Sequence, residues 1–174
     1  MKTAALMAAQ VALEEGKYAQ GFPEYGPERM GAPVTGYTRI SDEIITIHCG
    51  VASPDIVVIL DATLIGQIDV IAGLGEDGVL ILNTPDDPAN VRKELGLKGG
   101  RVFTVDATQI SIDEIGRPIP NTPMMGALIK VTELLNMETL KKDIEKKFMK
   151  KFGDKIVQGN FNAIERAYKE VKSE

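Results

Sequence analysis

Three short, continuous runs of apolar residues lie in the middle of the chain. They span residues 55–61, 79–82 and 102–105, are rich in β-branched side chains and are separated by segments long enough to form helices. Continuous rather than alternating apolar runs are typical of parallel strands that are covered on both faces. The pattern therefore predicts an α/β fold with a doubly wound, mostly parallel sheet.

Two extended segments ahead of these runs predict an added antiparallel pair. Residues 33–40 and 43–48 flank the polar dipeptide Ser41-Asp42. Short extended segments on either side of a polar turn are typical of a hairpin. The sequence therefore predicts a β-hairpin that turns at Ser41-Asp42.

The last third of the chain has the periodicity of helices. Apolar residues recur there at helical spacing in two series, and each series leaves a charged face. Packing against the sheet explains these stripes better than contact with a cofactor does. Asn121-Thr122-Pro123 is expected to cap and open a further helix, because a capping side chain followed by proline suits a first turn. The two series are Met137, Leu140, Ile144 and Phe148, and Val157, Phe161, Ile164, Tyr168 and Val171.

Residues 3–13 predict a helix that is apolar on almost every side and is interrupted by Gln10. A helix without a polar face is normally buried all round. In a doubly wound fold the first helix follows a first strand and a glycine-rich turn, and its free N–H groups bind an anion. That strand and turn are expected to be absent here. Either the start is internal to a longer gene product, or another chain fills the gap and covers the helix.

Composition and charge narrow the function classes. The chain has 174 residues, of which 44% are hydrophobic and 26% charged, and this predicts one globular domain over residues 1–174. The net charge of −5 argues against nucleic acid as a partner, because wide contact with a phosphate backbone needs a basic face. The apolar runs are too short for a membrane span and the start lacks a signal-peptide pattern, so we expect a cytoplasmic protein.

The chain has a single cysteine, Cys49, and a single histidine, His48. One cysteine forms no internal disulfide and cannot supply the four thiolates that usually hold an iron–sulfur cluster. The adjacent pair lacks a second pair at metal-ligand spacing, so no metal site is predicted and a core or strand-end role is favoured. Glu24 and Glu28 are separated by a non-helical segment, which leaves an acid/base pair between them unsupported. We therefore predict no catalytic residue.

The tripeptide Asp-Ala-Thr occurs at the ends of two predicted strands, at residues 61–63 and 106–108. Ligands of open α/β sheets gather at strand ends. Helix capping explains the same residues, because Asp and Thr accept hydrogen bonds from free helix N–H groups. We favour capping at both places.

The segment GFPEYGPERMGAPV, residues 21–34, predicts a stiff loop that carries charged and aromatic side chains. Loops that merely join strands are usually short and polar, so this one is expected to hold something. Contact with a ligand and contact with a partner subunit both stay open, since interfaces also favour Tyr and Arg. The side chains concerned are Glu24, Tyr25, Glu28 and Arg29.

Four tracts carry a family resemblance: EGKYAQGFPEYGPERMGAPVTGYTRI (15–40), DIVVILDATL (55–64), VDATQI (105–110) and RPIPNTPMMGALIKVT (117–132). In this order they resemble the gamma subunit of 2-oxoacid:ferredoxin oxidoreductases, most closely that of the pyruvate enzyme. The family normally has a Gly-Arg-Gly-Gly-Gln-Gly type turn just before the segment that matches residues 1–5. That turn is missing from this sequence.

The resemblance implies a multi-subunit enzyme that decarboxylates a 2-oxo acid on thiamine diphosphate with Mg²⁺. The enzyme transfers the acyl group to coenzyme A and passes electrons through 4Fe–4S clusters to ferredoxin. In the family the alpha and beta chains hold the thiamine cofactor, and the clusters lie on the beta and delta chains. The gamma chain packs against these subunits and helps to bind coenzyme A. The resemblance thus implies alpha, beta and delta partners, and no cofactor held by this chain alone.

A coenzyme A site has to hold phosphates, which favours fixed cations and backbone N–H groups in rigid turns. Arg29, between Pro27 and Gly31, fits this description, and Lys2 with Thr3 offers a second anion site at the first helix. The alternative is a purely structural subunit of a branched-chain, aryl or oxalate oxidoreductase without ligand contact. The corresponding interface residues are Glu24, Tyr25, Glu28, Arg29 and Met30.

Overall fold

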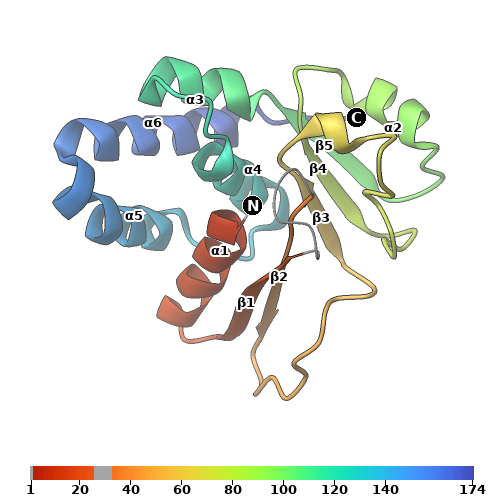
Figure 1. Ribbon diagram of the computed structural model, residues 1–174, viewed down its shortest axis with the longest axis horizontal. Coiled ribbons are helices and arrows are strands. Elements are labelled where there is room, and N and C mark those ends of the chain that lie inside the picture. Colours follow the sequence, from red (N-terminus) through yellow and green to blue (C-terminus); the bar gives the residue numbers. More distant parts are fainter. Residues whose placement is uncertain (1, 26–32) are drawn as a thin grey trace.

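The computed structural model describes residues 2–25 and 33–174, which form two sheets and a set of surrounding helices (Figure 1). The strands form an antiparallel two-stranded sheet and a mixed four-stranded sheet. The strands are β1 (Tyr18–Glu24), β2 (Thr35–Ser41), β3 (Ile56–Ile59), β4 (Val79–Asn83), β5 (Arg101–Val105) and β6 (Lys172–Ser173). The helices are α1 (Lys2–Glu14), the short 3₁₀ helix η1 (Ala62–Leu64), α2 (Pro88–Leu95), α3 (Ala107–Ile115), α4 (Asn121–Thr132), α5 (Met137–Phe152) and α6 (Asp154–Glu170).

The three central apolar runs are confirmed as parallel strands. β3 pairs with β4 and β4 with β5 in parallel, and β6 adds a short antiparallel edge. One face of this sheet packs against α2 and residues 62–74, and the other against α3, α4 and α6. β4 is buried along its whole length because it lies between two strands and two layers. This arrangement confirms the α/β, mostly parallel fold.

The antiparallel hairpin is present, but its strands are not the predicted pair. β2 pairs with β1, so that Tyr18 lies opposite Ser41 and Glu24 opposite Thr35. Residues 43–48 form no strand. The prediction of a turn at Ser41-Asp42 is therefore wrong, because the hairpin pairs residues 18–24 with residues 35–41.

Contact with α1 explains this pairing. Thr38 on β2 donates from its hydroxyl to the carbonyl oxygen of Ala5 at 3.0 Å. Gly21 on β1 lies so close to α1 that a Cβ there would stand 2.9 Å from the same carbonyl oxygen. The register is set by burial against a helix from the start of the chain, and a local turn pattern carries no information about that contact.

α1 is covered mostly by its own chain. It contacts β1, β2, α4 and α5, and Val11 and Ala12 are completely buried. The expectation that another chain must cover this helix is therefore wrong for most of its surface, because the hairpin and the C-terminal helices close over it. Two apolar side chains stay partly open, with Leu6 39% and Leu13 49% exposed.

The two apolar series in the C-terminal third are confirmed as the buried stripes of α5 and α6. Leu140, Ile144 and Ile164 are completely buried. Their main partners are α1 and α4 rather than the sheet, so much of the core lies between helices. The predicted cap at Asn121-Thr122 is wrong: the residue before α4 is Pro120, which makes no side-chain capping bond.

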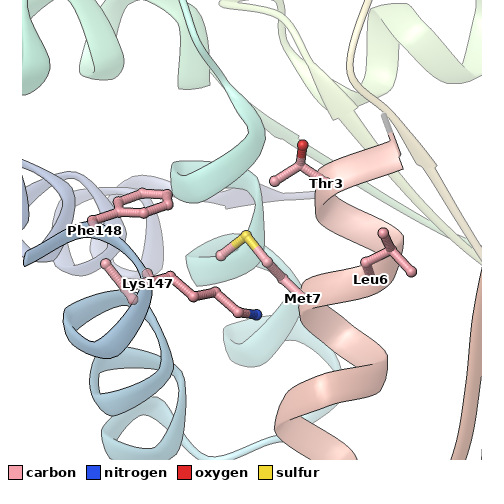
Figure 2. A pocket seen from close by; sticks show the side chains of 6 residues that line it. Thr3, Leu6, Met7, Lys147 and Phe148 are labelled. Carbon is pink, nitrogen blue, oxygen red and sulfur yellow. The ribbon is translucent and has the colours of Figure 1, made fainter. Parts of the chain in front are cut away.

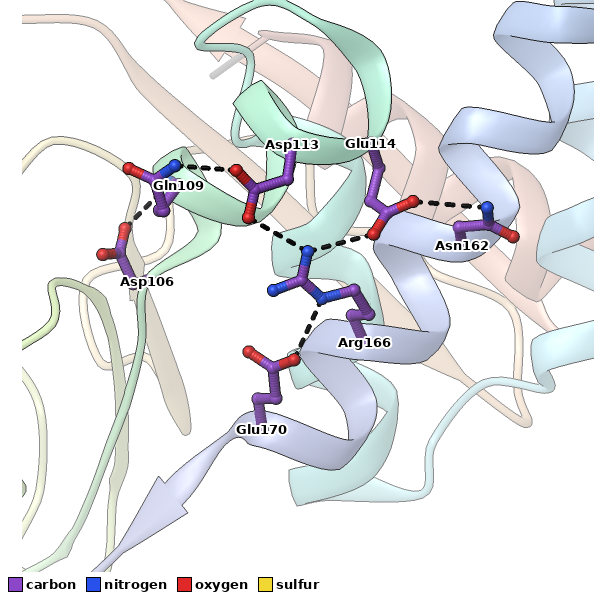
Figure 3. A network of polar contacts seen from close by, with 7 residues as sticks. All are labelled: Asp106, Gln109, Asp113, Glu114, Asn162, Arg166 and Glu170. Carbon is purple, nitrogen blue, oxygen red and sulfur yellow. Dashed lines mark hydrogen bonds and ion pairs between the residues drawn. The ribbon is translucent and has the colours of Figure 1, made fainter.

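Arg166 on α6 ties that helix to α3 (Figure 3). Its Nη1 donates to Asp113 Oδ2 at 3.1 Å and to Glu114 Oε1 at 3.0 Å, and its Nε donates to Glu170 Oε1 at 3.0 Å. These three bonds to carboxylates raise the pKa of Arg166. The bonds from Gln109 and Arg166 lower the pKa of Asp113 from its ordinary value of 3.8.

Arg166→Gln is expected to lower the Tm by roughly 2–4 °C at pH 7. Because the pKa of Asp113 is depressed in the folded state, its pairing stabilises the fold above pH 3.8 and is lost as the pH falls below that value. The Tm gap between wild type and variant, measured by circular dichroism, should therefore be constant above about pH 5 and narrow as the pH falls below 3.8. Arg117→Gln is the matched control, since Arg117 is exposed. An equal loss in both variants, or a gap that is the same at every pH, would contradict the prediction.

Candidate functional site

A shallow groove of about 570 Å³ lies at the carboxyl end of the parallel sheet. The ends of β3 and β4 and the segments that begin α3 and α4 meet there. In open α/β sheets this edge is where ligands bind, and the volume falls within the usual range of small-molecule sites. The lining residues are Leu60, Asp61, Ala62, Asn83, Thr108, Pro118, Ile119, Pro120 and Asn121.

Asn83 organises the floor of this groove. Its Nδ2 donates to the carbonyl oxygen of Leu60 at 2.9 Å and to Thr108 Oγ1 at 2.8 Å, and its Oδ1 accepts from the Thr108 N–H at 3.1 Å. The side chain is 8% exposed, so these bonds form in a largely desolvated environment. Asn83 thereby joins the end of β3, the end of β4 and the first turn of α3. Sequence reasoning missed this residue, although a polar side chain directly after an apolar run is a usable signal.

The two Asp-Ala-Thr tripeptides are confirmed as caps. Asp61 Oδ1 accepts from the Thr63 N–H at 3.0 Å and from the Thr63 hydroxyl at 2.7 Å. Asp106 Oδ1 accepts from the Gln109 N–H at 2.9 Å. Asp61 also lines the groove, so capping through one carboxylate oxygen leaves this residue accessible to a ligand.

Two helices begin at the groove. α3 starts beside Asn83, and α4 starts directly after Pro120, which supplies no side-chain cap. Helix N-termini carry partial positive charge and suit phosphate or carboxylate groups. The groove therefore combines these helix starts with Asp61, Asn83 and Asn121 as hydrogen-bonding side chains.

Thr3 lines a second, smaller pocket of about 200 Å³ between α1 and α5 (Figure 2). Its walls are mainly apolar, and the one charged side chain among its lining residues is Lys147. Lys147 Nζ donates to Asp143 Oδ2 at 2.7 Å, so its charge is balanced within the chain. Thr3 is not among the residues that line the carboxyl-edge groove, and the side chain of Lys2 lies outside the described part. The lining residues are Thr3, Leu6, Met7, Ile144, Lys147 and Phe148.

Part of the predicted loop site falls on the hairpin. Tyr37 donates from its hydroxyl to Glu24 Oε2 at 2.6 Å, and this bond raises the pKa of Tyr37. Tyr25 is 62% exposed at the end of β1. The other predicted loop contacts lie outside the described residues. These are Glu28, Arg29, Met30 and Gly31.

The His48-Cys49 pair lies on the hairpin face that points away from α1. His48 Nδ1 and Gln20 Nε2 are 3.0 Å apart. Arg39 Nη2 donates to the Gly50 carbonyl oxygen at 2.9 Å and lies 3.8 Å from Cys49 Sγ. Both residues are exposed and neither belongs to a strand, so the favoured core or strand-end role is wrong. The exposed loop 42–55 carries them instead.

The family model described as pyruvate ferredoxin/flavodoxin oxidoreductase matches residues 1–170. The chain belongs to this family. It is 48% identical over 171 residues to the pyruvate synthase subunit PorC of Thermotoga maritima. The aligned region covers 98% of this chain and 88% of the relative. The crystal structure of that pyruvate oxidoreductase subunit superposes with a TM-score of 0.87 at 46% identity, over 99% of this chain and 90% of the other. The resemblance to gamma-type chains is thereby confirmed.

One further relative and one solved structure of the same fold widen the comparison. The common gamma subunit of the pyruvate/ketoisovalerate oxidoreductases of Thermococcus kodakarensis is 42% identical over 166 residues, covering 95% of this chain and 88% of the relative. The 2-oxoglutarate:ferredoxin oxidoreductase of Magnetococcus marinus, solved with 2-oxoglutarate, coenzyme A and succinyl-CoA, shares the fold with a TM-score of 0.75. Its identity is 18%, over 96% of this chain and 28% of the other. The present chain is therefore a subunit of a 2-oxoacid:ferredoxin oxidoreductase.

The side chains present do not suit an iron–sulfur cluster, since the single cysteine is exposed and stands beside Arg39. Within residues 2–25 and 33–174, no three His, Cys, Asp or Glu side chains are grouped so as to hold a metal ion. None of the described helices has the length and apolar character needed to cross a bilayer. The groove, in contrast, is lined by side chains that donate and side chains that accept hydrogen bonds, a combination that suits a nucleotide-bearing cofactor.

Proposed function

We propose that this chain is the gamma subunit of a thiamine-diphosphate-dependent pyruvate:ferredoxin oxidoreductase, which helps to assemble the complex and to bind coenzyme A for acetyl-CoA formation. The main support for this proposal is the 48% identity with the pyruvate synthase subunit PorC over 98% of the chain. Two oxo acids are named for the Thermococcus relative, so a branched-chain substrate is the second candidate. In either case the substrate specificity would be determined by the chains that hold the thiamine cofactor.

Coenzyme A is proposed to place its nucleotide end in the carboxyl-edge groove. Asp61 offers a carboxylate oxygen to ribose hydroxyls or the adenine amino group, and the first turn of α4 offers N–H groups to a phosphate. A fold neighbour holds coenzyme A in its structure, which supports this ligand class. Lys2, Thr3, Arg29 and Gly31 stay predictions as further phosphate contacts.

The tip of the hairpin is proposed to contact a partner subunit. Tyr25 is 62% exposed beside Glu24, and exposed Tyr side chains are frequent anchors of protein interfaces. Glu28, Arg29 and Met30 continue this segment in the sequence. The alpha, beta and delta chains are the proposed partners, and ferredoxin receives electrons through the assembled complex.

The purified chain alone is expected to show no pyruvate-dependent reduction of ferredoxin, because the thiamine cofactor is proposed to lie on other chains and a single cysteine cannot hold a cluster. Activity should appear when the chain is combined with the alpha, beta and delta chains, and should be absent when this chain is left out. Ferredoxin reduction followed by absorbance checks both statements. Turnover by the chain alone would refute the proposal.

Arg29→Ala is expected to raise the KM for coenzyme A roughly tenfold in the assembled complex, as loss of a charged hydrogen bond does, while the KM for pyruvate changes little. Arg101→Ala is the control, because Arg101 is an exposed arginine at the amino end of β5, away from the groove. Steady-state kinetics with each substrate varied separately give the two constants. An unchanged KM for coenzyme A would assign Arg29 to the subunit interface.

A further inference from the structure

The second half of α5 and the facing side of α1 form a surface that is both basic and apolar. Ile144, Lys147 and Phe148 line the small pocket from α5, and Leu6 lines it from α1 (Figure 2). Lys151 lies seven residues after Ile144 and four after Lys147, so it continues the same side of the helix. We call this region the α1–α5 surface; it comprises Leu6, Lys147, Phe148, Lys150, Lys151 and Phe152.

The charge of this surface is opposite to that of the whole chain. The net charge is −5, yet residues 146–151 include four lysines and no acid. Two of them are paired: Lys146 with Glu14 at 3.2 Å and Lys147 with Asp143 at 2.7 Å. Lys150 and Lys151 are exposed, and among the described residues neither has an ion-pair or hydrogen-bond partner. Two positive charges therefore remain available beside the pocket.

Lysines in a last helical turn are favourable by themselves, because they face the negative end of the helix dipole. That effect explains Lys150 and Lys151 but not the apolar groups next to them. Phe152 is 57% exposed, and its ring packs edge-on against Phe148 with the ring centroids 5.7 Å apart. Phe148 is only partly buried, so an exposed aromatic ring stands here beside an apolar pocket. Apolar surface left in water costs free energy, and such surfaces mark sites of protein contact.

We infer that the α1–α5 surface docks an acidic segment of a partner protein, which inserts one large apolar side chain into the pocket. The pocket volume of about 200 Å³ is sufficient for one such side chain, since a cavity of about 150 Å³ accepts benzene. Carboxylates flanking the inserted side chain pair with Lys150 and Lys151, and the inserted group covers Leu6 and Phe148. This inference rests on the proposed function, because the partner would be another chain of the oxidoreductase complex.

Carbodiimide coupling in the assembled complex tests the charge contact directly. This reagent joins a lysine amine to a carboxylate without a spacer, so it links groups that already form an ion pair. Mass spectrometry is expected to find Lys150 or Lys151 linked to an Asp or Glu of another chain. Links from these two lysines to this chain alone, or no link, would overturn the inference.

Affinity measurements with variants test the same surface. The double substitution K150E/K151E is expected to weaken the affinity of this chain for the remaining subunits at least tenfold at low salt, and less at high salt. Phe152→Ser should weaken it at every salt concentration. Lys142→Glu is the matched control. Lys142 is exposed on the same helix, on the side away from the pocket, and has no ion-pair or hydrogen-bond partner among the described residues. This substitution should change the affinity for the other subunits little. Circular dichroism confirms that each variant is folded.

The outcomes separate the two proposals. If the wild-type chain does not join the alpha, beta and delta chains at all, the proposed function fails and this inference with it. If the chain joins and K150E/K151E behaves like Lys142→Glu, the inference alone is wrong. A third outcome also overturns it: wild-type binding to RNA or to anionic vesicles that K150E/K151E abolishes while subunit affinity stays unchanged.

Discussion

Gly126→Ala is expected to lower the Tm of the chain by roughly 5–10 °C, which corresponds to about 2–3 kcal/mol of overpacking. Gly126 lies in α4 where α6 crosses it, and a Cβ at this position would stand 2.2 Å from the carbonyl oxygen of Ile164. That atom belongs to the backbone of α6, so no side-chain rotation relieves the clash and the two helices must separate. Thermal unfolding followed by circular dichroism measures the loss.

Gly75→Ala is the control for this substitution, because a Cβ at Gly75 meets no atom within 4 Å. It should change the Tm by no more than about 1 °C. Gly159→Ala repeats the test at the contact between α6 and α3, where the new Cβ would lie 2.4 Å from the Glu114 carbonyl oxygen. A Gly126→Ala protein as stable as Gly75→Ala would show that α4 and α6 do not approach as closely as the structure has them.

The parallel sheet could be predicted because both of its faces are covered by other parts of the chain. A strand between two layers requires apolar residues on both of its faces. β4 meets this requirement with Leu80, Ile81 and Leu82, so the strand is visible in the sequence as a continuous apolar run. The stripes of α5 and α6 could be predicted for a related reason, since one buried side of a helix fixes a spacing of three and four residues.

The hairpin and the cover of α1 could not be predicted in this way, because both depend on contacts between distant segments. Thr38 and Gly21 are positioned by their contacts with α1, and no residue close to them in the sequence indicates those contacts. A polar dipeptide such as Ser41-Asp42 indicates a turn equally well whether or not a strand follows. Tertiary contact therefore overrode the local signal.

The candidate site was predicted in part. Capping by Asp61 and Asp106 follows from their position after strands, and the structure confirms it. The role of Asn83 requires β3, β4 and α3 to be adjacent in space, which sequence order does not state. Thr3 was selected for a helix start that binds anions, but its side chain faces an apolar pocket.

Asn83→Ala is expected to have the largest effect on the groove. The change removes the partner of the Leu60 carbonyl oxygen and of the Thr108 N–H, and leaving such buried groups unpaired costs about 1–3 kcal/mol of unfolding free energy. The end of β3 and the start of α3 then lose their common anchor. In the assembled enzyme the KM for coenzyme A should rise roughly tenfold, while the KM for pyruvate stays within about twofold, because the proposed site for pyruvate lies on other chains.

Asn90→Ala is the matched control, since Asn90 is an exposed asparagine on α2 and should leave both stability and kinetics unchanged. Urea unfolding gives the stability change, and steady-state kinetics with each substrate varied give the two constants. The two readouts can be separated, because urea unfolding reports the loss of the buried bonds and the KM for coenzyme A reports the effect of that loss on the groove. An Asn83→Ala enzyme that is destabilised yet binds coenzyme A normally would show that this ligand occupies a different surface of the complex.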